Sequence, residues 1–151
     1  MLKTFSAAIL AVAFASPALA DGPLQSEMTA WIVTYDDAGD EVLSETVDVA
    51  PGSLVEYRLV YTNIGDVPLG GLVVSSPVPE ATDLELGSET SEIATAFEAS
   101  IDNGESWGVP PLRTDDGEPA DSGDYDLVRW STESEIEPGE TWEFAYRVSV
   151  E

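Results

Sequence analysis

The chain has 151 residues, of which thirty are acidic, five are basic and none is histidine, and its formal net charge is −25. This excess of acid argues against binding to nucleic acid or anionic lipid, because both are bound through lysine and arginine. The hydrophobic fraction of 43%, with 9% aromatic residues, is too high for a disordered chain and is sufficient for a folded core.

The first twenty residues predict a secretory signal peptide. Lys3 precedes an apolar run from Ala7 to Ala15, and Ala18-Leu19-Ala20 ends the segment. The apolar run is too short to span a bilayer stably, which argues against the alternative of a retained membrane anchor. We therefore expect cleavage before Asp21, no stable membrane insertion afterwards, and export to the periplasm, the cell surface or the medium.

The part of the chain after the predicted cleavage site has an unusual composition. Residues 21–151 hold four arginines, thirty acids and no lysine, and the difference gives a net charge of −26. Cysteine is absent from the whole chain, so no disulfide, thiol nucleophile or thiolate metal site is available. The length fits one domain, which we expect over residues 28–151 after a short N-terminal extension over residues 21–27.

Alternating apolar residues and turn signals predict strands from Met28 onward. A first strand ends at the turn 36–40 and is expected to place three side chains on one buried face: Trp31, Val33 and Tyr35. A second strand stops at Pro51-Gly52 and carries Leu43, Val47 and Val49. A third strand over 55–62 is expected to bury Val55, Tyr57, Leu59 and Tyr61, with Glu56 and Arg58 mostly on the other face.

Asn63 and Gly65 close the third strand. An asparagine side chain can bind backbone groups two residues on, and glycine tolerates a tight exit from a strand. We therefore interpret Asn63 as a turn-forming residue, with an ion-ligand role together with Asp66 as the alternative.

The second half of the chain continues the strand pattern. Gly71–Val74 leads into two prolines, at positions 77 and 79, that interrupt ladder pairing. Ile93, Phe97, Ala99 and Ile101 alternate before Asp102-Asn103-Gly104, which is a hairpin signal. After a long loop over 107–124, a strand begins near Tyr125 and contains Trp130, and the strand 141–150 alternates strictly after the turn 137–140.

Together these segments predict an all-β fold. Seven to nine short strands separated by turns fit an immunoglobulin-like Greek-key β-sandwich, with a closed barrel as the alternative. The aromatic face of the strand 141–150 needs cover from a facing sheet, and we expect Trp31, Trp130 and Trp142 in the core.

Several motifs resemble those of a known family. The stretch Val55–Gly65 with its Tyr-Thr-Asn-Ile-Gly ending, then Leu72-Val73-Val74 and Pro79, is similar to the repeat family called domain of unknown function 11. Phe97–Trp107 and Glu137–Glu140 resemble its later strands, so the resemblance covers roughly residues 47–150. It implies an immunoglobulin-like module of secreted and cell-surface bacterial proteins, with adhesive, surface-layer or spacer roles.

The composition argues against an enzyme. Without His, Cys or Lys after the predicted cleavage site, the usual bases and activated nucleophiles are missing. Paired carboxylates that cleave glycosides remain as a third choice, although thirty acids produce such pairs by chance.

Calcium is the cofactor that the sequence allows, because it takes oxygen ligands from loops rich in acids. The first candidate site is the long loop with its neighbouring acids: Asp115, Asp116, Glu118, Asp121, Asp124 and Asp126. The second is the first turn, with Asp36, Asp37 and Asp40. Neither matches the spacing of an EF-hand loop.

Trp107 follows a turn and is the candidate anchor for a partner, with a core plug at the end of the sandwich as the alternative. We expect an exported, non-catalytic binding module whose partner is a protein or a cell-surface glycan. The alternative is a structural subunit that assembles with itself, by edge pairing or by calcium bridges.

Overall fold

The computed structural model describes residues 22–45 and 48–151. Within them the chain forms nine strands and one short 3₁₀ helix. The strands are β1 Leu24–Tyr35, β2 Glu41–Glu45, β3 Leu54–Asn63, β4 Val73–Pro77, β5 Thr82–Leu84, β6 Thr90–Ser91, β7 Ala96–Ser100, β8 Leu127–Ser131 and β9 Thr141–Val150. The helix η1 spans Ser122–Asp124. No described helix is long and apolar enough to cross a membrane.

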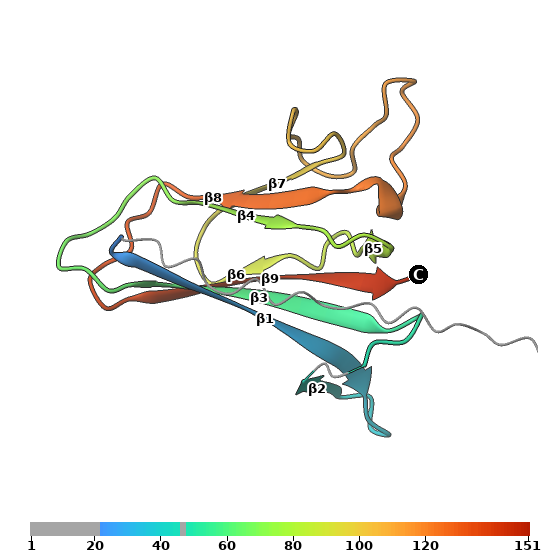
Figure 1. The fold of residues 1–151 in the computed structure, drawn as a ribbon, viewed down its shortest axis with the longest axis horizontal. Coiled ribbons are helices and arrows are strands. Elements are labelled where there is room, and N and C mark those ends of the chain that lie inside the picture. Colours follow the sequence, from blue (N-terminus) through green and yellow to red (C-terminus); the bar gives the residue numbers. More distant parts are fainter. Residues whose placement is uncertain (1–21, 46–47) are drawn as a thin grey trace, which may run out of the picture.

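Two antiparallel sheets face each other (Figure 1). The large sheet has the order β2-β1-β3-β9-β5, and β6 also pairs with β9. The small sheet has the order β4-β8-β7. β3 pairs with β9, and β4 pairs with β8, although these strands are far apart in the sequence. Such pairs arise because the chain crosses between the two sheets, as in a Greek key. The prediction of an all-β sandwich with seven to nine strands is confirmed.

The core lies between the two sheets and is largely aromatic. Trp130 of β8 packs against Phe144 and Tyr146 of β9, with ring centroids 5.7 and 6.1 Å apart. Tyr57 of β3 stacks on Tyr146 at 5.4 Å. Strict alternation in β3 and β9 buries these residues because each strand presents every second side chain to the facing sheet.

Tyr146 also bridges the two sheets with its hydroxyl. The hydroxyl lies 2.9 Å from Ser76 Oγ of β4 and donates to the carbonyl oxygen of Pro77 at 2.7 Å. Burial raises the pKa of Tyr146, so the group is a neutral phenol at every physiological pH. The bond lets a polar atom remain inside the apolar core without an unsatisfied hydrogen-bonding group.

The beginning of β1 corrects the predicted domain boundary. Residues 24–27, assigned to an N-terminal extension, belong to the large sheet, where Leu24 lies opposite Asn63 and Glu27 opposite Val60. Gln25, Ser26 and Glu27 are exposed, so no burial pattern marks them as a strand. Backbone pairing with β3, rather than burial of side chains, holds these residues in the sheet.

Trp31 corrects the predicted core. It lies opposite Glu56, which lies opposite Arg147, so these three side chains share the outer face of the large sheet. The inner face of β1 is carried by the alternate residues, including Ala30, which lies opposite the core residue Tyr57. Trp31 is half-buried, and Tyr35 on the same face is 60% exposed. Trp130 and Trp142 are buried in the core, as predicted.

The turn signals are largely confirmed. Asn103 and Gly104 both have positive φ, of 57° and 84°, as in a type I′ turn, and Ala99 and Gly108 pair on either side of them. Gly52 has a φ of 85° in the turn before β3. The second strand ends at Glu45; Val49 packs against the core, whereas Val47 lies outside the described residues.

Candidate interaction surface

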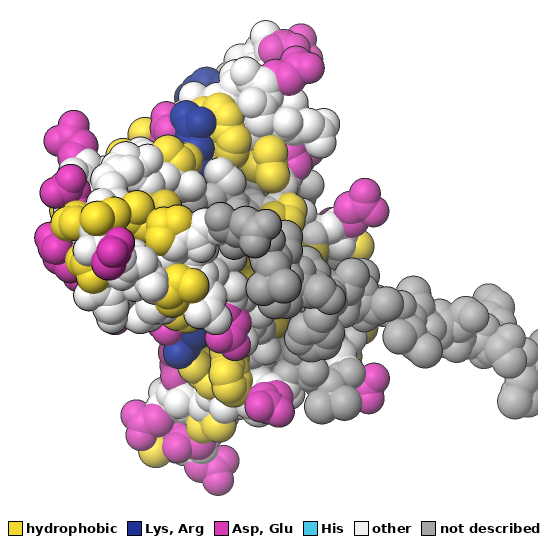
Figure 2. Space-filling view, turned by 60° about the vertical axis from the view of Figure 1, so that its left-hand side comes forward, with side chains coloured by type: hydrophobic (Ala, Val, Ile, Leu, Met, Phe, Trp, Pro, Cys, Tyr) yellow, Lys and Arg dark blue, Asp and Glu magenta, His cyan; other side chains and the backbone are white. Residues whose placement is uncertain are grey.

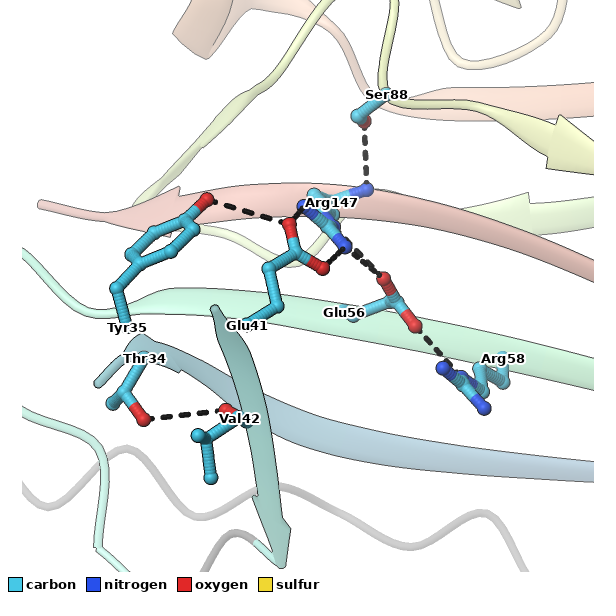
Figure 3. Close-up of polar contacts among 8 residues, drawn as sticks. All are labelled: Thr34, Tyr35, Glu41, Val42, Glu56, Arg58, Ser88 and Arg147. Atoms are coloured by element: carbon cyan, nitrogen blue, oxygen red, sulfur yellow. Dashed lines mark hydrogen bonds and ion pairs between the residues drawn. The ribbon is translucent and has the colours of Figure 1, made fainter. Parts of the chain in front are cut away.

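An ion network covers the outer face of the large sheet (Figure 3). Arg147 of β9 binds Glu41 of β2 through two nitrogens, at 2.7 and 2.8 Å, and binds Glu56 of β3 at 2.8 Å through Nε. Glu56 also accepts a bond of 2.7 Å from Arg58 Nε. The network therefore ties β2 and β3 to β9 and satisfies both oxygens of Glu56, which is only 6% exposed.

The pKa of Glu41 is lowered by its hydrogen bonds to Arg147, so this carboxylate contributes stability above its unfolded pKa and loses that contribution as the pH falls through its folded pKa. We expect the difference in melting temperature between the wild type and E41Q to be largest above about pH 5, to shrink below the reference pKa near 4.3, and to close only below the lowered pKa of the folded state. Thermal melts from pH 3 to pH 8 measure it. E45Q removes the same charge from the exposed end of β2 and is the control; equal pH profiles for the two variants would contradict the assignment.

The acids of the long loop do not come together. Residues 101–126, which we call the arm, connect β7 to β8, and most of them stand above the small sheet (Figure 1), whereas η1 at their end contacts β5. Asp115, Asp116 and Glu118 lie in an exposed hairpin, in which Arg113 pairs with Pro119. Asp124 caps η1 by accepting a bond of 2.8 Å from the nitrogen of Asp121. Asp126 instead binds the nitrogen of Asn103 through Oδ2, at 2.6 Å.

The acids of the first turn have a structural use as well. Asp36 Oδ1 accepts bonds from the nitrogens of Ala38 and Asp40, at 2.8 and 3.0 Å, and so closes the turn between β1 and β2. Across the described residues, no three acids are placed so that they could hold a metal ion. Among the described residues, Asp126 Oδ1 is the one buried side-chain oxygen or nitrogen without a hydrogen-bond partner, but no group of three acids surrounds it, so calcium at either candidate site stays a prediction.

The dense negative charge itself predicts a response to salt. Raising NaCl from 0.1 to 1 M shortens the screening length from about 10 to about 3 Å, which weakens the repulsion among exposed acids. We expect the melting temperature to rise with NaCl, and to rise equally with CaCl₂ at the same ionic strength. A saturable additional rise with millimolar CaCl₂ would contradict this expectation and would favour the predicted calcium sites.

Trp107 folds back onto the outer face of the small sheet. Its Nε1 donates to the carbonyl oxygen of Gly104 at 3.1 Å, and the guanidinium of Arg129 lies 4.1 Å from the centre of its ring. Arg129 in turn binds Glu98 at 2.8 Å. Trp107 is half-buried, so it is neither the freely displayed anchor nor the core plug that the sequence analysis weighed. The most exposed large apolar residue of the arm is Val109, at 74%.

A second surface lies at the end of the sandwich where β3 leads to β4 and β8 leads to β9. Asn63 is completely buried there and shapes both loops. Its Nδ2 donates to the carbonyl oxygens of Val67 and Ile136, at 2.8 and 2.9 Å, and its Oδ1 accepts from the nitrogen of Gly65 at 2.9 Å. The turn role predicted for Asn63 is confirmed, and the bond to Ile136 extends this role to a loop more than seventy residues away.

The rest of this end is also hydrogen-bonded. The nitrogen of Ile64 donates to the carbonyl oxygen of Pro23 at 2.7 Å, and Leu69 pairs with Ile136. We call the surface formed by Pro23 and the loops 64–70 and 135–140 the Ile64 end. Its two loops hold each other in place, so the side chains that they expose are positioned before any partner arrives.

The Ile64 end exposes apolar side chains inside an acidic surround (Figure 2). Ile64 is 61% and Val67 54% exposed, and Pro23 and Pro68 are exposed beside them. The exposed acids of the adjoining segments are Asp66, Glu133, Glu135, Glu137 and Glu140. The segments 64–72 and 132–140 contain no lysine or arginine. Apolar side chains displayed on a fixed loop are a feature of interaction sites.

The sequence analysis did not single out the Ile64 end. Only Asn63, Gly65 and Asp66 of this turn were assigned a role from the sequence. The usable signal was the presence of two apolar residues, Ile64 and Val67, inside a turn whose glycine and proline stop any strand alternation. An apolar residue that no periodic pattern assigns to the core is a candidate for exposure on an interaction surface.

Comparison of the chain with protein-family models, curated proteins and solved structures finds no match. The resemblance to the domain of unknown function 11 therefore stays a prediction. The function has to be argued from the residues themselves.

Proposed function

We propose that the protein is an exported, non-catalytic binding module that acts in the periplasm or at the cell surface. The observation that carries the proposal is the Ile64 end. A buried asparagine with three side-chain hydrogen bonds fixes the loop that exposes Ile64 and Val67 to solvent. Fixing a loop in advance lowers the entropy that is lost on binding, which favours recognition.

The surroundings of the charged groups support a binding role over catalysis. Arg129 and Arg147 are engaged by carboxylates of neighbouring strands, and Arg58 is engaged by Glu56 of its own strand. The carboxylates of Asp36, Asp102 and Glu140 close turns or bind nearby backbone groups. These contacts stabilise the sandwich and its turns. The leader-like residues 1–20 are the basis for proposing export.

The experiment is site-directed photo-crosslinking in cells that express the full chain. A photoreactive residue, Ile64→p-benzoylphenylalanine, is compared with the same residue at Asp37, in the exposed turn between β1 and β2. We expect a discrete adduct from position 64 only, in a fraction outside the cytoplasm, on a chain whose N-terminus is Asp21. Retention of residues 1–20 in the cytoplasm, or no adduct from position 64, would contradict the proposal.

A further inference from the structure

The chemistry of the Ile64 end indicates what kind of partner fits it. We propose that it docks a protein whose surface offers an apolar patch bordered by lysine or arginine side chains, as on one face of an amphipathic helix. This inference rests on the proposed function and specifies the partner.

The apolar part of the contact follows from Ile64 and Val67. Both side chains are more than half exposed, and the backbone that carries them is held at Pro23, Val67 and Ile136 by hydrogen bonds of 2.7 to 2.9 Å. Burying these side chains in a partner releases water from apolar surface without first ordering the loop.

The charged part of the contact follows from the exposed acids around Ile64 and Val67, which we call the rim: Asp66, Glu133, Glu135, Glu137 and Glu140. Every charged residue in the segments 64–72 and 132–140 is an acid. The pKa of Glu140 is lowered by hydrogen bonds from the nitrogen of Glu137 and from Trp142, so this carboxylate is ionised at neutral pH. A partner that brings cations opposite such a rim associates faster and is discriminated from neutral or acidic proteins.

The same charges argue against three other binding partners: a second copy of the chain, nucleic acid and anionic lipid. A second copy would bring the same acids against the rim on a chain that carries −26 after the predicted cleavage, and nucleic acid and anionic lipid are repelled likewise. The arm differs, because Arg113 is exposed there and Arg129 lies beside Trp107. The purely acidic surround distinguishes the Ile64 end from the apolar residues of the arm.

The test uses residues 21–151 and three synthetic helical peptides of equal length. One combines leucine with lysine, the second replaces leucine by serine, and the third replaces lysine by glutamate. We expect the leucine–lysine peptide to bind with amide shift changes concentrated in residues 64–69 and 135–140, and to bind I64S/V67S at least tenfold more weakly. V109S/L86S removes two exposed apolar side chains elsewhere and should bind like the wild type. Affinity should fall as NaCl is raised.

Six outcomes would overturn the inference. The first four are equal affinity of I64S/V67S and V109S/L86S, equal binding of the serine–lysine peptide, tight binding of the leucine–glutamate peptide, and dimers of the wild type that I64S/V67S abolishes. Shift changes confined to the arm would leave a binding module in place and refute this surface. The absence of binding by any peptide, together with a crosslink from position 64, would refute the cationic partner while the proposed function survives.

Discussion

Replacing Asn63 by alanine is expected to lower the free energy of unfolding by about 3 kcal/mol. The change leaves the carbonyl oxygen of Val67 and the nitrogen of Gly65 without the Asn63 side chain, and leaves the carbonyl oxygen of Ile136 with the nitrogen of Leu69 alone. A buried polar group left unpaired costs about 1–3 kcal/mol of stability. The cost is smaller where water reaches the loops and forms hydrogen bonds to the unpaired groups. Urea unfolding should show a lower midpoint with an unchanged slope.

Two further variants isolate the cause. N63D keeps the size of the side chain but replaces the donating amide by a carboxylate, which faces two carbonyl oxygens, so we expect a loss at least as large as in N63A. Q25A removes an exposed amide from β1 and should change stability by no more than about 0.5 kcal/mol. A stable N63D would show that the two hydrogen bonds donated by Asn63 Nδ2 contribute little, because this variant keeps the side-chain volume and the oxygen that accepts from Gly65.

The second large effect is expected for R147M. Methionine keeps the apolar stem but leaves Glu41 without its arginine and Glu56 with Arg58 alone. Removing one partner of a buried ion pair costs about 3–5 kcal/mol; because Arg58 remains, we expect about 2–3 kcal/mol at pH 7. Urea midpoints measured at pH 7 and pH 4.5 test this value.

The pH dependence of R147M should run in the same direction as that of E41Q, because both changes remove the contact between Glu41 and Arg147. In the wild type Arg147 lowers the pKa of Glu41, and the stability that this contact contributes is lost as the pH falls through the folded pKa of Glu41. The deficit of R147M relative to the wild type should therefore shrink as the pH falls. R113M removes the same charge from the exposed hairpin of the arm, where Arg113 donates to the carbonyl oxygen of Gly117. An equal loss in R113M would indicate a general effect of charge in an acidic protein.

The sequence predicted the fold best where burial alternates. In β3 and β9 each second residue faces the small sheet, so Tyr57, Phe144 and Tyr146 could be assigned to the core from periodicity alone. Residues 24–27 were missed because both faces of that part of β1 are largely exposed, which leaves only backbone pairing to define it. Trp31 was misplaced because an aromatic residue is equally compatible with a half-buried outer face.

The interaction surface was harder to predict for a different reason. The burial of Glu56 depends on Arg147, which lies 91 residues further along the chain, and the shape of the Ile64 loop depends on Ile136. Neither partner is visible in a local window of sequence. The runs of acids resembled metal sites for the same reason. Asp36, Asp124 and Asp126 bind backbone nitrogens, and the sequence shows the number of carboxylates but not their hydrogen-bond partners.

The position of β9 has a consequence for how the chain folds. It pairs with β3, β5 and β6, and every one of these strands precedes it in the sequence. The large sheet cannot close until residues 141–150 have been synthesised, and contacts between such distant segments form slowly. Until then the nascent chain lacks the strand that joins β3 to β5 and β6. A polypeptide in this condition can still be threaded through a membrane channel, which suits the route proposed for it.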